Sequence, residues 1–441
     1  KYETALEYME RILNLGGDAD FDHLAAHAKT LSGEERAELI RLYEALRQRH
    51  PNNPEVRYSV ALLQQSNGMP THAMDTLKPL LDEYPDFQPA ILLYGALMFE
   101  RGDKEAALSY VRRNTRRYPD SHRLGTLYAR MLVEDRQLQA AEDEFLALTK
   151  RFPDQPGLRL SFALVALENN HLDLAEKTLR ELIGAGHHVQ EAHYYLGRIA
   201  EDRDQRDQAI DHYQQIESGP HYLSALSRLS LLMARNGELT AVLDRLHTLR
   251  TQQPQQSENF WLIEVNLLNE LQERTAAVRS ASEALTAYPD NLRLRYTRAM
   301  LLDEQTEFDM MEADLRYILE REPDNAVALN ALGYTLTLRR ERLDEALALI
   351  TRALTLDPEN PAIIDSMGWI AFRQGRLQEA TQFLARAWTL DRNPEIAAHL
   401  GEVLWVSGKR DDAVRILREG AEIDAENAVL VETLERLGVS L

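Results

Sequence analysis

The feature that most constrains this chain is the regular spacing of its prolines. A first series, 34 residues apart, is Pro51, Pro85, Pro119 and Pro153. A second series, with intervals of 35, 34 and 35 residues, is Pro254, Pro289, Pro323 and Pro358. A period of roughly 20 to 50 residues is typical of stacked units, each of which buries its apolar face against its neighbours. The 441 residues therefore predict an elongated array rather than one compact core.

Two further positions recur within each period. When the units are aligned from Pro54 onward, the eighth position is small in ten of eleven copies, Val265 being the exception. These small residues are Ala61, Gly95, Ala129, Ala163, Gly197, Ser230, Ala299, Gly333, Gly368 and Gly401. A small residue lets two helices approach closely. Alanine fills the twentieth position in most units, with an apolar residue four positions later on the same helix face. Each unit therefore predicts a pair of amphipathic helices.

This pattern is similar to the tetratricopeptide repeat, whose 34-residue signature reads W-x2-L-G-x2-Y, then A-x3-F, then Pro. A clear copy is "EAHYYLGRIAEDRDQRDQAIDHY", residues 191–213. The resemblance implies an all-α fold, a right-handed superhelix (α-solenoid) of about eleven helix-turn-helix repeats over residues 54–427. We expect residues 1–53 to form additional N-terminal helices that are degenerate or outside the repeat, and residues 428–441 to form a capping helix.

Composition excludes several classes of function. The chain has 50 Lys and Arg against 71 Asp and Glu, a net charge of −21, which argues against binding to nucleic acid. It has no cysteine, so disulfides, thiolate metal sites and a cysteine nucleophile are excluded. The longest apolar run, residues 90–99, is about half of the roughly 20 residues that a membrane span needs. We expect no cofactor.

One serine has a neighbourhood that resembles part of a catalytic motif. Ser366 in "DSMGW" matches the second half of G-x-S-x-G, but Ile364 occupies the place of the first glycine. The motif also needs a strained strand-to-helix turn, whereas the repeat places this serine within a helix. We therefore expect no catalytic residue here.

Histidines give two weak candidates for a metal site. His23 and His27 are four residues apart, and His187, His188 and His193 cluster around a predicted loop. Neither group provides four ligands or the H-E-x-x-H pattern of zinc proteases. We interpret them as surface and loop histidines and expect no metal.

The tetratricopeptide resemblance also implies a groove, lined by positions two, five, nine and twelve of the first helix of each repeat. Toward the C-terminus these positions are occupied by Tyr296, Met300, Tyr334, Asp365, Trp369, Phe372 and Trp405. Aromatic side chains with few charges favour an apolar or amphipathic peptide segment as the partner. Alternatively, these aromatics pack the repeats together. In the tenth repeat we expect Ile364 and Met367 to face the core, and Asp365 and Trp369 to face the groove.

A second candidate surface lies at the N-terminus. An apolar stripe at helical spacing is formed by Tyr2, Leu6, Met9 and Leu13. It predicts a contact with a partner protein, or else a cap folded onto the first repeat.

Three functional interpretations compete. A protein-binding adaptor follows from an array that is nearly all surface. An enzyme would need a separate catalytic domain, and both ends are too short for one. A chaperone cofactor would need a Lys and an Asn at the fifth and ninth positions, where the ninth repeat has Asn330 and Tyr334. We therefore predict a non-enzymatic adaptor.

A narrower resemblance concerns residues 328–380, "ALNALGYTLTLRRERLDEALALITRALTLDPENPAIIDSMGWIAFRQGRLQEA", and residues 392–413, "RNPEIAAHLGEVLWVSGKRDDA". Both look like the C-terminal half of proteobacterial outer-membrane tetratricopeptide lipoproteins that bind a periplasmic carboxyl-terminal processing protease. The resemblance implies an adaptor that binds and activates this protease and delivers protein substrates, among them peptidoglycan hydrolases. It also implies a location at the periplasmic face of the outer membrane, through a lipid anchor whose cysteine this chain lacks. The alternative is a scaffold for envelope polysaccharide export or another periplasmic assembly.

Overall fold

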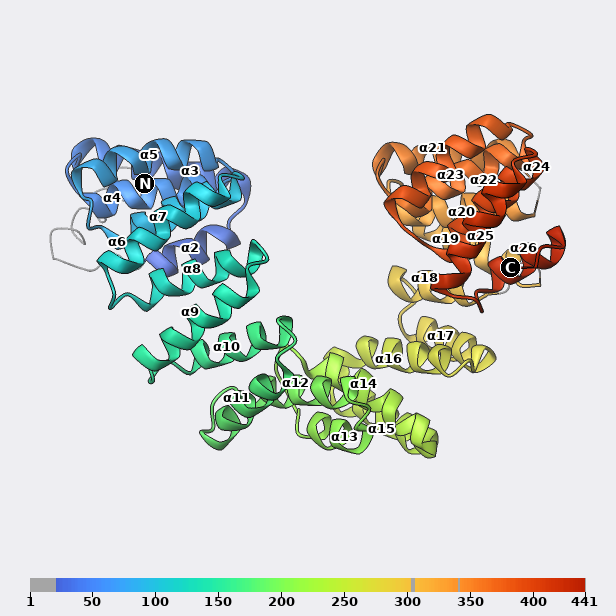
Figure 1. The fold of residues 1–441 in the computed structure, drawn as a ribbon, viewed down its shortest axis with the longest axis horizontal. Helices are drawn as coiled ribbons and strands as arrows, with labels where there is room; N and C mark the ends of the chain where they lie inside the picture. The colour runs from blue at the N-terminus through green and yellow to red at the C-terminus, as the bar shows by residue number, and fades with distance from the viewer. Residues whose placement is uncertain (1–20, 303–305, 340–341, 441) are drawn as a thin grey trace. The chain divides into compact units, whose positions relative to one another are not determined.

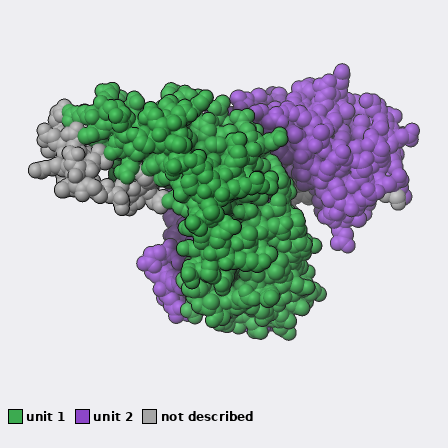
Figure 2. All heavy atoms as spheres, turned by 60° about the vertical axis from the view of Figure 1, so that its left-hand side comes forward, with its two compact units in different colours: residues 1–225 green, residues 226–441 purple. Residues whose placement is uncertain are grey.

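The computed structural model describes residues 21–302, 306–339 and 342–440, and all regular structure among these residues is helical (Figure 1). The chain divides into two compact units, Lys1–Ala225 and Leu226–Leu441, which Figure 2 shows in different colours. The predicted all-α fold of helix-turn-helix pairs is confirmed. None of the described helices has both the length and the apolar character required to cross a membrane.

The first unit consists of helix pairs preceded by two further helices. The helices are α2 (Phe21–Thr30), α3 (Gly33–Arg49), α4 (Pro54–Ser66), α5 (Pro70–Glu83), α6 (Gln88–Glu100), α7 (Lys104–Arg117), α8 (His122–Glu134), α9 (Leu138–Arg151), α10 (Pro156–Glu168), α11 (Leu172–Gly184), α12 (Val189–Asp202) and α13 (Arg206–Gln214). Helix α14 (Tyr222–Met233) contains the boundary between the two units.

The second unit continues the pairing and ends with one unpaired helix. Its elements are the π-type turn η1 (Ala234–Glu238), α15 (Leu239–Gln252), the 3-10 turn η2 (Pro254–Gln256), α16 (Ser257–Glu270), α17 (Arg274–Ala287), α18 (Leu292–Leu301), α19 (Phe308–Arg321), α20 (Ala326–Leu338), α21 (Leu343–Leu356), α22 (Pro361–Arg373), α23 (Leu377–Leu390), α24 (Pro394–Val406), α25 (Arg410–Ile423) and α26 (Ala428–Leu437). Helix α26 packs on α24 and α25, and its Leu430 is fully buried against Ala398 and Leu417. The limits of the repeat array at residues 54 and 427 stay a prediction.

In the helix pairs of the first unit, the turn between the two helices uses one left-handed residue. In the first unit these residues recur every 34 positions, at Gly68, Gly102, Arg136, Asn170 and Asp204, with φ between 55° and 96°. The following residue donates its N–H to the carbonyl five positions earlier, as in the Schellman ending of a helix. The turn therefore depends on backbone geometry, which side chains as different as Asp and Arg tolerate.

The small eighth position allows the two helices of a pair to touch. A Cβ added at Gly197 on α12 would lie 2.5 Å from the ring of Tyr213 on α13, and Tyr213 is fully buried. At Gly333 on α20 the added atom would lie 2.6 Å from Ile350 and 3.1 Å from the Ala346 carbonyl oxygen. A side chain larger than hydrogen at either position therefore requires the facing side chain or the helix to shift.

Gly197→Ala is expected to lower the free energy of unfolding by about 1–3 kcal/mol, because the Tyr213 ring must shift within a packed core. The matched control is Gly157→Ala on α10, where an added Cβ meets no atom within 4 Å. That control is expected to be neutral or slightly stabilising, since alanine favours helix. Urea unfolding followed by circular dichroism measures both variants. Equal stability of the two would contradict the close packing at Gly197.

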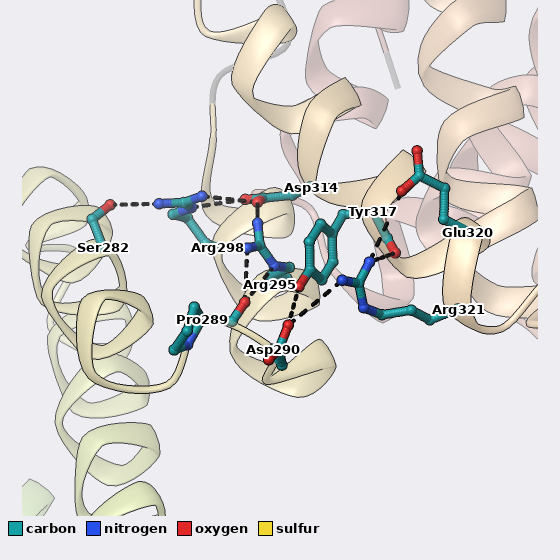
Figure 3. Close-up of polar contacts among 9 residues, drawn as sticks. All are labelled: Ser282, Pro289, Asp290, Arg295, Arg298, Asp314, Tyr317, Glu320 and Arg321. Carbon is teal, nitrogen blue, oxygen red and sulfur yellow. Dashed lines mark hydrogen bonds and ion pairs between the residues drawn. The ribbon is translucent and has the colours of Figure 1, made fainter.

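A buried carboxylate joins α18 to α19 (Figure 3). Asp314 is 1% exposed and accepts two hydrogen bonds from Arg298, at 2.7 and 2.8 Å, and one from Arg295 at 2.9 Å. The Tyr317 ring lies between two guanidinium groups, with Arg295 3.6 Å and Arg321 3.4 Å from its centroid. Two guanidinium groups thus provide this buried carboxyl group with the hydrogen bonds that water would otherwise supply.

Candidate functional site

Three consecutive first helices, α20, α22 and α24, build the candidate site, and each begins with an asparagine cap. The side chains of Asn325, Asn360 and Asn393 accept hydrogen bonds from backbone N–H groups of the first helical turn. Proline follows directly in α22 and α24, at Pro361 and Pro394, where its missing N–H has no cost. These local signals determine the residue at which each helix begins. The start of each helix in turn determines which of its side chains lie opposite those of the neighbouring helices.

A buried polar network connects the three helices. His399 on α24 is 2% exposed, and its Nδ1 lies 2.9 Å from Oδ2 of Asp365 on α22. The imidazole stacks on Trp369, with ring centroids 4.1 Å apart. The Tyr334 hydroxyl on α20 donates to Glu395 at 2.9 Å and lies 3.5 Å from His399 Nε2. Both ring nitrogens of His399 therefore face a polar group of a neighbouring helix.

The charge of His399 is set by two opposing effects. Burial alone would lower its pKa, because an apolar environment disfavours the cation. The carboxylate of Asp365, and after it those of Glu395 and Glu402, outweigh burial and raise the pKa of His399 above 6.5. The site thus favours a protonated histidine next to the Asp365 carboxylate.

The free energy of unfolding is expected to fall as pH rises from about 6.5 through the folded pKa of His399. Because the folded pKa is raised, the stabilisation is complete below the unfolded pKa and is lost when the folded protein also releases the proton. His399→Phe should remove this dependence. Urea unfolding of both proteins at a series of pH values measures it, followed by tryptophan fluorescence, since all four tryptophans lie in the second unit. Parallel profiles of the two proteins would contradict the prediction.

Two cavities adjoin this network, and Tyr334 lines both. The acidic cavity, of about 340 Å³, is lined among others by Tyr296, Met300, Tyr334, Asp365, Asp391 and Glu395. The aromatic cavity, of about 520 Å³, is lined among others by Tyr334, Trp369, Phe372, His399, Glu402 and Arg436. Volumes of this size accept one or two side chains of a bound segment.

The structure brings together six of the seven predicted groove residues. Tyr296, Met300, Tyr334 and Asp365 line the acidic cavity, and Tyr334, Trp369 and Phe372 line the aromatic cavity. Trp405 lines neither cavity; it packs against the core of α22 to α25, with the Arg410 guanidinium 4.9 Å from its ring. Whether these residues contact a partner stays a prediction.

In the tenth repeat, the residues expected to face the core and those expected to face the groove are all buried. Ile364 and Met367 are buried in the core, in agreement with the prediction. Asp365 and Trp369 line the two cavities, yet they are only 5% and 4% exposed. The reason is His399, which pairs with the Asp365 carboxylate and covers the Trp369 ring.

His399, at the centre of the network, was not among the residues predicted from the sequence. A signal existed, because Asp365 and His399 are 34 residues apart, close to one repeat period. His399 lies one position beyond the equivalent of Asp365 in the next repeat, and an acid and a base at neighbouring positions of adjacent repeats are expected to meet. Glu395 and Arg436 were missed as well; Arg436 on α26 pairs with Glu402 at 2.5 Å.

The remaining sequence candidates lie elsewhere. Ser366 is buried within α22, and its hydroxyl donates to the Ala362 carbonyl at 3.0 Å. The apolar stripe of Tyr2, Leu6, Met9 and Leu13 lies outside the described residues.

The predicted histidine clusters separate in the structure. His193 on α12 meets His212 on α13, with their Nδ1 atoms 3.1 Å apart, whereas His187 and His188 lie in the preceding loop. Burial lowers the pKa of His193 and of His212. His27 lies on α2 and is exposed; the side chain of His23 is outside the described part of the chain. Within that part, no three His, Asp or Glu side chains are grouped so that they could hold a metal ion.

Comparison with known proteins shows which repeat family these helix pairs resemble. Sequence profiles described as tetratricopeptide repeat match residues 97–156, 160–240 and 311–361, and also 337–398 and 371–436. A TPR repeat-containing protein of Pseudomonas aeruginosa is 42% identical over 402 residues, which cover 91% of this chain and 68% of that protein. The rat mitochondrial import receptor subunit TOM70 is 25% identical over 125 residues, or 28% of this chain and 20% of the receptor subunit.

Among solved structures, a tetratricopeptide repeat protein from Parabacteroides merdae aligns with a TM-score of 0.45 at 15% identity. The alignment covers 57% of this chain and 99% of that one. The repeat profiles and the long alignment with the Pseudomonas protein agree with the helix pairs described above, and repeats of this kind serve protein–protein interaction. This chain belongs to the tetratricopeptide repeat family.

Proposed function

We propose that this chain is a non-enzymatic adaptor that holds a segment of a partner protein against α20, α22 and α24. The observation that carries the proposal is the pair of adjoining cavities on either side of Tyr334. They combine aromatic walls with a small number of polar groups, which is the composition of a protein-binding site. Met300 at 45% and Val327 at 51% exposure add apolar surface at the acidic cavity.

The partner we propose is a periplasmic carboxyl-terminal processing protease, which the adaptor binds and activates. Its protein substrates, such as peptidoglycan hydrolases, would then be the segments held at the C-terminal site. Support for this assignment is the resemblance of residues 328–380 and 392–413 to lipoproteins with that role. An adaptor that binds both proteins raises the concentration of each near the other. The proposed location is the periplasmic face of the outer membrane, through a lipid anchor.

The direct test is cleavage of a peptidoglycan hydrolase by the purified protease from the same species. We expect the rate to rise with added adaptor and to saturate, and the two proteins to co-elute on gel filtration. A cleavage rate that is independent of adaptor, without co-elution, would contradict the proposed partner. Recovery of polysaccharide export subunits by the immobilised chain from envelope extract would support the alternative scaffold instead.

A truncation separates the two roles of the N-terminal stripe. Deleting residues 1–15 removes Tyr2, Leu6, Met9 and Leu13. If the stripe binds the protease, co-elution is lost and the melting temperature is unchanged. If the melting temperature falls while co-elution remains, the stripe is a cap and the protease binds elsewhere.

A further inference from the structure

We propose that the acidic cavity receives a lysine or arginine side chain of the bound protein segment. This inference rests on the proposed function, because it assumes that α20, α22 and α24 hold a segment of a partner. It adds the chemical class that the site selects, which the apolar and aromatic lining alone does not specify.

The acidic cavity carries an excess of negative charge. The acidic cavity is lined by the carboxyl groups of Asp365, Asp391 and Glu395, and none of the described residues that line it is Lys, Arg or His. Asp365 is already paired with His399, so its charge is balanced within the protein. Glu395 accepts a hydrogen bond from the Tyr334 hydroxyl and shares the His399 cation with Asp365, whereas no described side chain reaches the Asp391 carboxylate. Three carboxylates therefore face one histidine. The cavity therefore lacks a positive charge that a ligand could supply.

The acidic cavity also has unused capacity to accept hydrogen bonds. The side-chain amide of Asn330 lines the same cavity, and its Oδ1 has no hydrogen-bond partner in the described structure. Together with the carboxylates of Asp391 and Glu395, the lining offers acceptors in excess of donors. Lysine and arginine are the side chains that carry several donors and no acceptor. A carboxylate-bearing segment would instead meet uncompensated repulsion here.

The shape of the acidic cavity suits a long side chain. Tyr296, Met300 and Val327 are the apolar part of the lining, and Met300 and Val327 are largely exposed. Lysine and arginine have long apolar stems that pack against such surfaces while the charged group reaches a polar end. The Tyr296 ring adds a surface on which a guanidinium can stack. An extended apolar residue would fill the space but leave the carboxylates unpaired.

The neighbouring aromatic cavity serves as an internal contrast. Its acidic residues, Glu402 and Glu432, both pair with Arg436, at 2.5 and 3.4 Å. Because Arg373 also lines this cavity, two arginines face two carboxylates, and no preference for a cation follows. The selectivity for a basic residue is confined to the acidic cavity.

The experiment uses fluorescently labelled short peptides that are apolar except at one central position, which carries arginine, lysine, citrulline, norleucine or glutamate. Citrulline has the shape of arginine without the charge. Binding to the full chain is measured by fluorescence anisotropy. We expect the arginine and lysine peptides to bind about tenfold more tightly than the citrulline peptide, because charged hydrogen bonds are replaced by neutral ones. The glutamate peptide should bind most weakly.

Two variants locate the effect. Glu395→Gln combined with Asp391→Asn removes two of the three carboxylates that line the cavity, and the amide introduced by Glu395→Gln can still accept the Tyr334 hydrogen bond. This double variant should reduce the arginine preference to about twofold or less. The control, Asp411→Asn, removes a charge from an exposed residue of α25 that lines neither cavity, and should leave the preference intact.

The outcomes separate the two proposals. If all five peptides bind equally, or if the double variant keeps the full preference for arginine, the inference about the basic side chain is wrong while the peptide-binding site stands. If the glutamate peptide binds best, the charge argument is wrong. If no peptide binds at any composition, the proposed peptide site itself fails, and the inference fails with it.

Discussion

Asp314→Ala is expected to lower the free energy of unfolding of the second unit by about 3–5 kcal/mol. The carboxylate is almost fully buried and receives three hydrogen bonds, from Arg295 and Arg298. Its removal leaves two largely buried guanidinium groups without their counter-charge, and that penalty exceeds the value of the ion pair itself. Urea unfolding followed by tryptophan fluorescence measures this loss in the unit that contains all four tryptophans.

The matched control is Asp290→Ala in the same cluster (Figure 3). The Asp290 side chain is largely exposed and contacts Tyr317 and Arg321. Because water replaces these contacts readily, a loss of less than about 1 kcal/mol is expected. If the two variants lose the same small amount, Asp314 is solvated in solution and the buried ion pair does not hold α18 to α19.

Trp369→Ala is expected to cost about 3–5 kcal/mol of unfolding free energy, as is typical of a buried tryptophan truncated to alanine. The indole stacks on His399 and lies 5.1 Å, centroid to centroid, from the Phe372 ring. The change removes one face of the aromatic cavity and the ring that covers the histidine. Thermal unfolding monitored by circular dichroism gives the cost without depending on the lost fluorophore.

This result decides how binding experiments at Trp369 are interpreted. Loss of partner binding in Trp369→Ala would follow from collapse of the site as well as from a lost contact. Trp369→Phe keeps an aromatic ring over His399 and should retain most of the stability, so its binding isolates the contribution of the indole. A melting temperature of Trp369→Ala equal to that of the unchanged protein would show that the indole is not part of the core.

The architecture could be predicted from the sequence because it depends on local, repeated rules. The 34-residue period and the small eighth position, as at Gly197 and Gly333, follow from the contact between paired helices. The network around His399 could not be predicted in the same way. Whether Asp365 faces water or a partner depends on the residue about one period away, which is His399. The repeat signature describes only what the repeats share, so it does not specify that residue.

Equivalent positions also differ in environment. Phe372 and Trp405 both occupy the twelfth position of a first helix, yet only Phe372 lines the aromatic cavity. Helix α26 supplies part of that cavity's wall through Thr433 and Arg436, although it is not the first helix of a complete repeat. A residue's role in the groove is therefore set by the element that follows, and the repeat signature carries no information about that element.

The hydrogen bond from Tyr334 to Glu395 joins residues 61 positions apart and passes over the repeat between them. In an ideal linear array each repeat contacts only the two repeats beside it. Unfolding can therefore begin at one end of the array and proceed one repeat at a time. A bond that skips a repeat resists this fraying, since α24 cannot leave without breaking a contact to α20. The backbone amides of α20, α22 and α24 should therefore exchange their hydrogens as one cooperative block. Tyr334→Phe should allow α24 to open separately.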